Sequence, residues 1–303
     1  MENQAAAPQK SGIVYAYLLI TFAIWGGIYV ATRFAVGILP SPVVVCLRNI
    51  LASITLLLMM RGEKFPKIEK RDWLFFTLIA ALGYYLTLVF TTRGTALAGA
   101  STSALVNALT PISITVIAAI VLKEKIDGMR IFCLALAIVG TCCVIKTDGG
   151  TGNLIGILLV VASLITQGAS TVIVRSLSAR YTAKQITTIA MLISLVFNIP
   201  TAAVSLAQMT EPIRMTVPAV LALLYMGVVG TALGQLYWGK SLALKEASFC
   251  SMFYPLQPVF SVLFGFFLLD EDLGLRFFIG LFFIGAGVVI SCLHSRKQER
   301  MAH

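Results

Sequence analysis

The chain has 303 residues, of which 58% are apolar and 12% are charged, and its formal net charge is +10. A water-soluble domain could not bury so large an apolar share, so lipid is expected to cover part of the surface. The composition therefore predicts a membrane protein and excludes an ordinary soluble domain.

Ten apolar runs follow one another along the chain, and each is long enough to cross the roughly 30 Å hydrocarbon core of a bilayer. The loops between them are short, so no soluble domain is expected among them. The predicted spans are 13–34, 43–60, 73–92, 100–122, 129–146, 154–174, 186–207, 217–238, 248–269 and 275–292.

Two stretches of the chain, 96–125 and 243–272, match at a constant offset of 147 residues. Glu124 then falls on Glu271, and the lysines that flank Glu124 become aspartates that flank Glu271. An apolar repeat whose matching loops change sign is typical of two half-proteins inserted in opposite orientations, with a transport site between them. We therefore predict an all-α membrane protein with ten transmembrane helices, arranged as two inverted five-helix repeats.

Basic residues are distributed unevenly over the predicted loops. If the N-terminus lies in the cytoplasm, 17 of the 23 Lys and Arg residues fall on the cytoplasmic side and 4 fall outside. Because Lys and Arg favour cytoplasmic loops, we expect a multi-pass protein of a bacterial inner membrane with both termini cytoplasmic. Anionic lipid accounts for the basic excess without a nucleic-acid partner. The predicted parts are a tail 1–12, repeats 13–147 and 151–294, and a tail 295–303.

Several motifs together resemble the drug/metabolite transporter superfamily, of the bacterial kind built from two EamA-type repeats. They are "AIWGGIYVATR" in the first run, "CLRNILAS" in the second, and the paired segments "ALTPISITVIAAIVLKEKI" and "PLQPVFSVLFGFFLLDEDLGLR". The resemblance covers nearly all of residues 13–292. It implies two inverted units of five helices around a central cavity lined by the first four helices of each unit. It also implies export or exchange of small metabolites, often amino acids, by alternating access.

Polar residues precede the two matched prolines at helical spacing. A proline within a helix leaves the carbonyl four residues earlier without its usual donor, and in lipid that carbonyl must face protein or water. We expect the prolines to act as hinges and the polar side chains to bind substrate, while helix–helix packing through hydrogen bonds is the alternative. The residues are Ser103 and Asn107 before Pro111, and Tyr254 and Gln257 before Pro258.

Arg48 lies inside the second apolar run, where a charge is costly unless it reaches the headgroups or faces a polar interior. On a cavity wall its guanidinium could hold a carboxylate through two parallel hydrogen bonds. Snorkelling and a structural bond to a carbonyl are the alternatives.

A second set of candidate residues could cover an apolar ligand, or could belong to the core or to the interfacial belt. It comprises Trp25, Tyr29, Tyr84, Gln167 and Tyr237.

None of the thirteen acidic residues falls in the middle of a predicted span. Proton-coupled carriers usually relay protons through an intramembrane carboxylate or histidine. Uniport or substrate exchange is therefore expected. Glu124 and Glu271, at matched helix ends, are the only acidic candidates for coupling, and helix-end hydrogen bonding within each repeat is the alternative.

The sequence contains no P-loop, HExxH or CxxC motif, and His294 and His303 are too isolated to predict a zinc site. We therefore expect no enzyme activity and no cofactor or metal. The expected function is secondary transport of a small metabolite, with an amino acid or aromatic compound favoured, by a monomer or homodimer in the bilayer. The alternatives are a proton-coupled drug or organic-cation exporter and a non-transporting membrane channel or scaffold.

Overall fold

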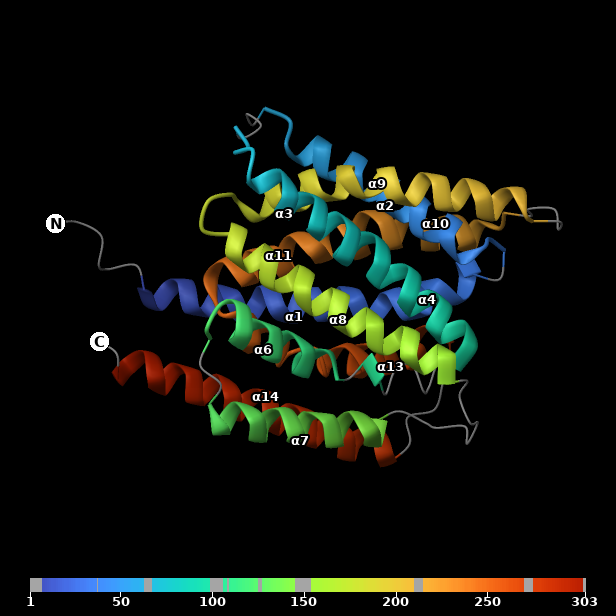
Figure 1. Ribbon diagram of the computed structural model, residues 1–303. Helices are drawn as coiled ribbons and strands as arrows, with labels where there is room; N and C mark the ends of the chain where they lie inside the picture. The colour runs from blue at the N-terminus through green and yellow to red at the C-terminus, as the bar shows by residue number, and fades with distance from the viewer. Residues whose placement is uncertain are drawn as a thin grey trace.

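The computed structural model describes residues 7–36, 38–62, 67–98, 106–107, 109–124, 127–144, 154–209, 215–269 and 275–301. Within these ranges every regular element is helical (Figure 1). The first half contains α1 (Ala7–Val36), α2 (Ser41–Met59), α3 (Asp72–Leu78), the π-helix η1 (Ile79–Leu86), α4 (Thr87–Ala98), α6 (Thr110–Val121) and α7 (Gly128–Val144).

The second half contains a closely similar series of helices. Its elements are α8 (Leu154–Leu177), α9 (Ala183–Ala207), α10 (Val217–Leu224), the π-helix η2 (Tyr225–Leu233), α11 (Gly234–Leu244), α12 (Ala247–Ser251), α13 (Leu256–Leu269) and α14 (Leu275–Met301).

Six helical stretches in the described part of the chain are long and apolar enough to cross a membrane. They are Ser41–Met59, Asp72–Gly94, Leu154–Leu177, Ala183–Ala207, Val217–Leu244 and Ala247–Phe267. Four shorter apolar helical stretches are Gly12–Ile28, Thr110–Val121, Ile131–Gly140 and Phe278–His294. Large apolar side chains on the outer surface are widely exposed, for example Leu58 at 63%, Ile120 at 73% and Phe282 at 71%. Lipid is the solvent in which such a surface is stable.

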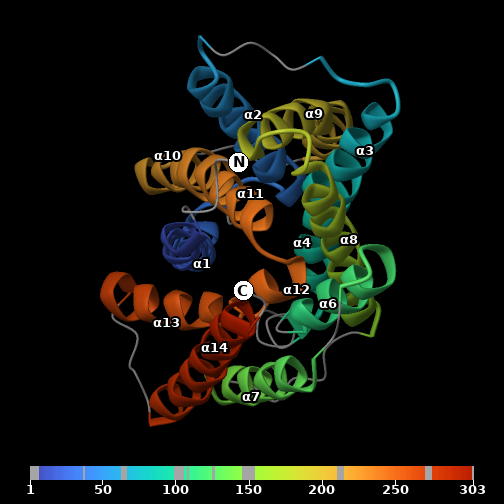
Figure 2. The ribbon, with the colours of Figure 1, turned by 90° about the vertical axis from the view of Figure 1, so that its left-hand side faces the viewer.

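The start of α1 and the end of α14 lie at the same end of the bundle, which we call the termini end (Figure 1). The α2–α3 loop, the α8–α9 turn and the α11–α12 turn also lie there, whereas the α1–α2 turn lies at the opposite end. Figures 1 and 2 place α7 beside α14 at one edge of the bundle, where the resemblance implies the fifth and tenth helices. Gly140 and Gly287 allow this close packing, because a Cβ on either would lie within 2.8 Å of a carbonyl oxygen of the other helix.

The two π-helices occupy matching places in the two halves. Residues 79–86 of η1 fall on 226–233 at the offset of 147, and η2 spans Tyr225–Leu233. Each packs against the other half: η1 contacts α8 and α9, and η2 contacts α1 and α2. Gly83 in η1 permits this approach, because a Cβ there would lie 2.2 Å from the Ser170 hydroxyl oxygen on α8. The halves therefore meet through segments that often occur at functional sites.

The matched prolines stand at helix starts, whereas the sequence placed them in the middle of continuous spans. Pro111 lies in the first turn of α6, which begins at Thr110. In the second half α12 ends at Ser251, a turn covers residues 252–255, and Pro258 lies in the first turn of α13. Proline is tolerated in a first turn because its missing N–H would have no partner there. Each proline therefore lies in the first turn of a helix, and Pro258 follows the break between α12 and α13.

Candidate functional site

Four aromatic side chains from both halves pack together in the interior of the bundle. Phe22 and Trp25 lie on α1, Trp238 lies on α11, and Tyr254 lies in the turn after α12. The ring centroids of Trp25 are 5.8 Å from Trp238 and 6.0 Å from Tyr254, and Phe22 lies 5.0 Å from Tyr254. All four side chains are buried. We call this group the aromatic cluster.

Hydrogen bonds attach the aromatic cluster to neighbouring elements. The Trp25 indole N–H donates to the carbonyl of Gly230 in η2 at 3.2 Å. The Gln167 amide, on α8, donates to the Tyr254 hydroxyl at 3.1 Å. The structure thus brings together Trp25, Gln167 and Tyr254, three of the residues that the sequence singled out.

Tyr84 lies in η1, and its carbonyl is held by two buried amide side chains. Asn49 on α2 donates to it at 3.0 Å, and Asn198 on α9 donates to it at 3.4 Å. Neither asparagine was among the residues expected to bind substrate. Each could have been found in the sequence as an amide within an apolar run, because such a side chain must find a partner in the protein.

A small polar pocket adjoins the aromatic cluster, and we call it the inner pocket. Its volume is about 10 Å³, enough for about one water molecule. Trp238 of the aromatic cluster contributes to its wall, together with Tyr84 and Gln167. The remaining lining comes from Gly83, Ser170, Thr171, Val174, Thr187, Gln235 and Gly239.

Arg48 is half-buried on α2 and binds the other half. Its Nε donates to the hydroxyl of Thr231 in η2 at 2.9 Å, and that hydroxyl donates to the Met226 carbonyl at 2.7 Å. Arg48 is therefore anchored through Nε, which leaves its two Nη groups as the pair with the geometry to hold a carboxylate. Arg48 and Trp25 bind the same π-helix one residue apart, at Thr231 and Gly230.

The other predicted site residues lie in different settings. Tyr237 stacks on Tyr17 at 5.5 Å, with the Lys240 ammonium 5.2 Å from its ring centroid. The carbonyl of Asn107 accepts a bond from the Thr110 hydroxyl at 2.6 Å. The carbonyl of Gln257 lies against α1, 3.0 Å from where a Cβ of Gly26 would stand. Ser103, Glu271 and the side chain of Tyr29 lie outside the described residues.

Glu124 joins the two halves at the termini end. Its carboxylate accepts bonds from the backbone N–H groups of Ala247 and Ser248, at 3.0 and 3.1 Å, and from the Ser248 hydroxyl at 2.6 Å. We call this arrangement the Glu124 cap, because it supplies the acceptor that the first turn of α12 lacks from its own N-cap residue, Glu246. The bond was expected within each repeat, whereas it runs from the first half to the second.

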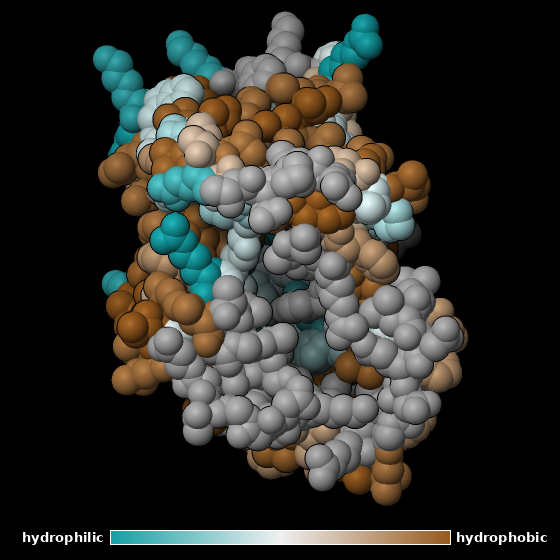
Figure 3. All heavy atoms as spheres, turned by 90° about the vertical axis from the view of Figure 1, so that its right-hand side faces the viewer, coloured by the Kyte–Doolittle hydropathy of each residue, from teal (hydrophilic) through white to brown (hydrophobic). Residues whose placement is uncertain are grey.

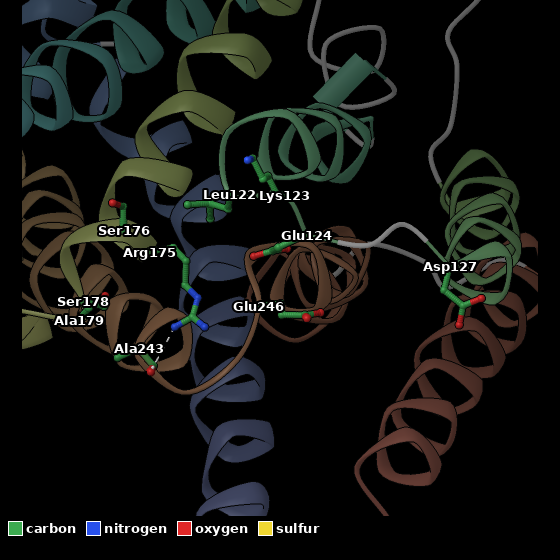
Figure 4. Close-up of a pocket in the computed structure, with 10 residues that line it drawn as sticks. All are labelled: Leu122, Lys123, Glu124, Asp127, Arg175, Ser176, Ser178, Ala179, Ala243 and Glu246. Atoms are coloured by element: carbon green, nitrogen blue, oxygen red, sulfur yellow. Dashed lines mark hydrogen bonds between the residues drawn. The ribbon is translucent and has the colours of Figure 1, made fainter. Parts of the chain in front are cut away.

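A pocket of about 830 Å³ is lined by Glu124 and by Glu246 beside the cap, and we call it the outer pocket (Figure 4). Arg175 on α8 extends into it and donates to the carbonyls of Leu242 and Ala243, at 2.8 and 3.4 Å. The outer and inner pockets are neighbours along α8, because Arg175 lines the first and Val174 lines the second.

A second polar group closes the termini end. Asp72, which is fully buried at the start of α3, accepts bonds from Arg180 at 2.6 Å and from the Tyr181 hydroxyl at 2.8 Å. Arg180 and Tyr181 belong to the α8–α9 turn of the other half. Burial and the bond to Asp72 raise the pKa of Tyr181, so its hydroxyl remains a donor at neutral pH. Seen from the opposite end, hydrophilic atoms of described residues are visible in the interior of the bundle, and apolar side chains cover much of its described surface (Figure 3).

The described residues form a helical bundle with an apolar, lipid-facing surface. Charged, aromatic and amide groups gather where its halves meet. These are features of a membrane transport protein. Comparison with known proteins identifies the family. The EamA-like transporter family matches residues 11–146 and again residues 154–293, so the chain belongs to this family and carries its repeat twice.

Relatives agree with this assignment, and a solved structure shares the fold. An uncharacterized transporter of Archaeoglobus fulgidus is 25% identical over 279 residues, which cover 90% of this chain and 96% of the relative. A probable terminal-alkyne amino-acid exporter of Streptantibioticus cattleyicolor is 26% identical over 244 residues, 80% of this chain and 81% of the relative. A crystal structure 15% identical in sequence superposes with a TM-score of 0.80 over 94% of this chain and 99% of that one, which supports the fold alone.

Proposed function

We propose that this protein is a secondary transporter that exports or exchanges an amino acid with an apolar or aromatic side chain, by alternating access. In this proposal ten helices cross the inner membrane as two inverted units, 13–147 and 151–294, and both termini are cytoplasmic. Transport is by uniport or exchange, without an intramembrane proton relay. The relatives are named as transporters, which supports a role other than catalysis.

The observation that carries the proposal is the meeting of Arg48 and Trp25 on one π-helix of the opposite half. A guanidinium suits a carboxylate, and an aromatic cluster suits an apolar or aromatic side chain. Together they match the two ends of such an amino acid. Because both contacts cross between the halves, a ligand that binds there can favour one arrangement of the halves over another.

The closed termini end supports a state of the transporter that is open toward the outer face. The Glu124 cap and the Asp72 group tie the halves together there. In the proposed cycle this state receives or releases substrate at the outer face. Breaking the two cytoplasmic connections then opens the outer pocket toward the inner one. The amino-acid exporter among the relatives is consistent with this substrate class.

Counterflow in proteoliposomes tests the proposal. Vesicles containing the purified protein are loaded with unlabelled L-leucine or L-phenylalanine and diluted into a trace of the same tritiated amino acid. A carrier that exchanges substrate accumulates label transiently above equilibrium, and protein-free vesicles serve as the control. A channel admits label without this overshoot, and a scaffold admits none beyond the control. Either result, for both amino acids, would overturn the proposed function.

A further inference from the structure

The inner pocket contains a buried hydroxyl without a partner. Thr171 on α8 is 2% exposed, and its Oγ1 has no hydrogen-bond partner among the residues that the structure describes. Other buried hydroxyls donate to their own helix: Ser163 on α8 to the Val160 carbonyl at 2.6 Å, and Thr188 on α9 to the Lys184 carbonyl at 2.8 Å. Leaving such a group unpaired costs free energy unless something else binds it. Thr171 is therefore placed to contact a bound group.

The lining of the inner pocket suits a small cation. All its side chains are neutral, and most of the polar ones offer oxygen acceptors, including Thr171, Gln235 and Tyr84. Gln167 already uses its amide nitrogen to donate to Tyr254, so its remaining amide atom is an acceptor oxygen. Trp238 adds an aromatic wall, and aromatic faces attract ammonium groups. A volume of about 10 Å³ admits a group about the size of water, and an ammonium group has this size.

The inner pocket and the anchor of Arg48 lie on one helical stretch. Thr231, the partner of Arg48, precedes Gln235, which lines the pocket, by four residues along η2 and α11. Four residues of an α-helix rise about 6 Å, so the two backbone positions lie about one helical turn apart.

We propose that the inner pocket is the ammonium subsite of this transporter, in which Thr171, Gln167 and Gln235 bind the α-ammonium group of an amino acid whose carboxylate lies at Arg48. This inference rests on the proposed function and narrows its substrate class to α-amino acids.

Binding of matched compounds to the purified full chain tests the subsite. The probes are L-leucine and L-phenylalanine, each paired with the acid that lacks its amine, 4-methylpentanoic acid and 3-phenylpropanoic acid. The wild-type protein should bind each amino acid at least about tenfold more tightly than its paired acid. Thr171→Val, which keeps the side-chain shape, should reduce that preference to about threefold or less while the acids bind as before. Gln235→Leu should act in the same direction.

Thr188→Val is the matched control, because Thr188 is equally buried but bonded to its own helix. It should leave the preference unchanged. If Thr171→Val and Gln235→Leu weaken amino acid and acid equally, or leave the preference unchanged, the pocket holds a buried water only and the subsite is wrong. If the wild-type protein binds the acids without preferring the amino acids, the subsite is also wrong, while counterflow can still succeed. If it binds none of the four compounds, the proposed substrate class fails and the subsite fails with it.

Discussion

Glu124 and Ser248 are joined across the two halves by a 2.6 Å hydrogen bond between a carboxylate and a hydroxyl. Two backbone N–H groups at the start of α12 donate to the same carboxylate. At the repeat offset of 147, the counterparts of these residues are Glu271 and Ser101, which lie outside the described residues. The repeat therefore predicts an equivalent pair at the other end of the bundle, so that each end can close by the same bond in turn.

Weakening the Glu124 cap should open the termini end. A thiol at Val174→Cys, in a protein with its six native cysteines replaced, reports access to the inner pocket in inside-out vesicles. An impermeant thiol reagent should modify this cysteine about tenfold faster in Glu124→Gln and in Ser248→Ala, because each substitution removes a hydrogen bond to the Glu124 carboxylate. The double variant should rise by less than the product of the two effects, since both remove one shared bond.

Ser176→Ala is the control for this prediction, because Ser176 lines the same outer pocket without belonging to the cap. It should leave the modification rate unchanged. Equal rates in Glu124→Gln and the parent protein would show that the cap does not restrict access.

Arg48 should distinguish acids from amines. Arg48→Lys keeps the positive charge but loses the planar pair of donors, so binding of 3-phenylpropanoic acid should weaken about tenfold while 2-phenylethylamine binds as before. Calorimetric titration of both compounds measures this, and an unchanged melting temperature shows that the variant is folded. A folded Arg48→Lys protein that binds the acid normally would contradict the carboxylate role. Thr231→Val, which removes only the anchor of Nε, should have a smaller effect.

Gly83 should be intolerant of a side chain. A Cβ at this position would lie 2.2 Å from the Ser170 hydroxyl oxygen and 2.9 Å from its Cβ. Gly83→Ala should therefore lower the melting temperature in detergent by about 2–6 °C, the effect of moderate overpacking. Adding Ser170→Gly should restore part of the loss.

Gly285→Ala is the matched control for the glycine prediction, because a Cβ at Gly285 meets nothing within 4 Å. It should leave the melting temperature unchanged or raise it slightly, since alanine is the better helix former. Similar losses in the two alanine variants would rule out a specific contact between η1 and α8.

Exchange should be independent of a proton gradient. Both oxygens of Glu124 accept hydrogen bonds from α12, which fits a structural role for this carboxylate. Vesicles with an imposed pH gradient and no substrate gradient should therefore show no concentrative uptake. Uptake that collapses with a protonophore, and that Glu124→Gln alone abolishes, would instead assign proton coupling to the cap.

Apolar patterning was sufficient to place the starts of most helices within about three residues. The run 129–146 corresponds to α7 at Gly128–Val144, and the run 154–174 corresponds to α8 at Leu154–Leu177. The pattern did not reveal the turn at 252–255 or the π-helices, because both keep an apolar composition while only the backbone hydrogen bonding changes. The inverted orientation of the two repeats stays a prediction.

The candidate site was predictable only in part. Trp25 and Gln167 were both in the second candidate set, and the structure places both beside Tyr254. The partners of Arg48 and Asp72 were not predictable, because Thr231 and Arg180 lie more than 100 residues away in the sequence. Thr171 gave no signal, since one hydroxyl in an apolar helix normally bonds to its own backbone. Substrate roles for all these residues stay predictions.

The most direct test of alternating access is to tie the two halves together at the termini end and measure exchange. In a protein with its native cysteines replaced, Glu124→Cys and Ser248→Cys are cross-linked with a short, reducible bifunctional thiol reagent. Each single variant treated in the same way is the control. Alternating access predicts that cross-linking abolishes counterflow of L-leucine or L-phenylalanine and that reduction restores it. Counterflow at the full rate in the cross-linked protein would contradict alternating access.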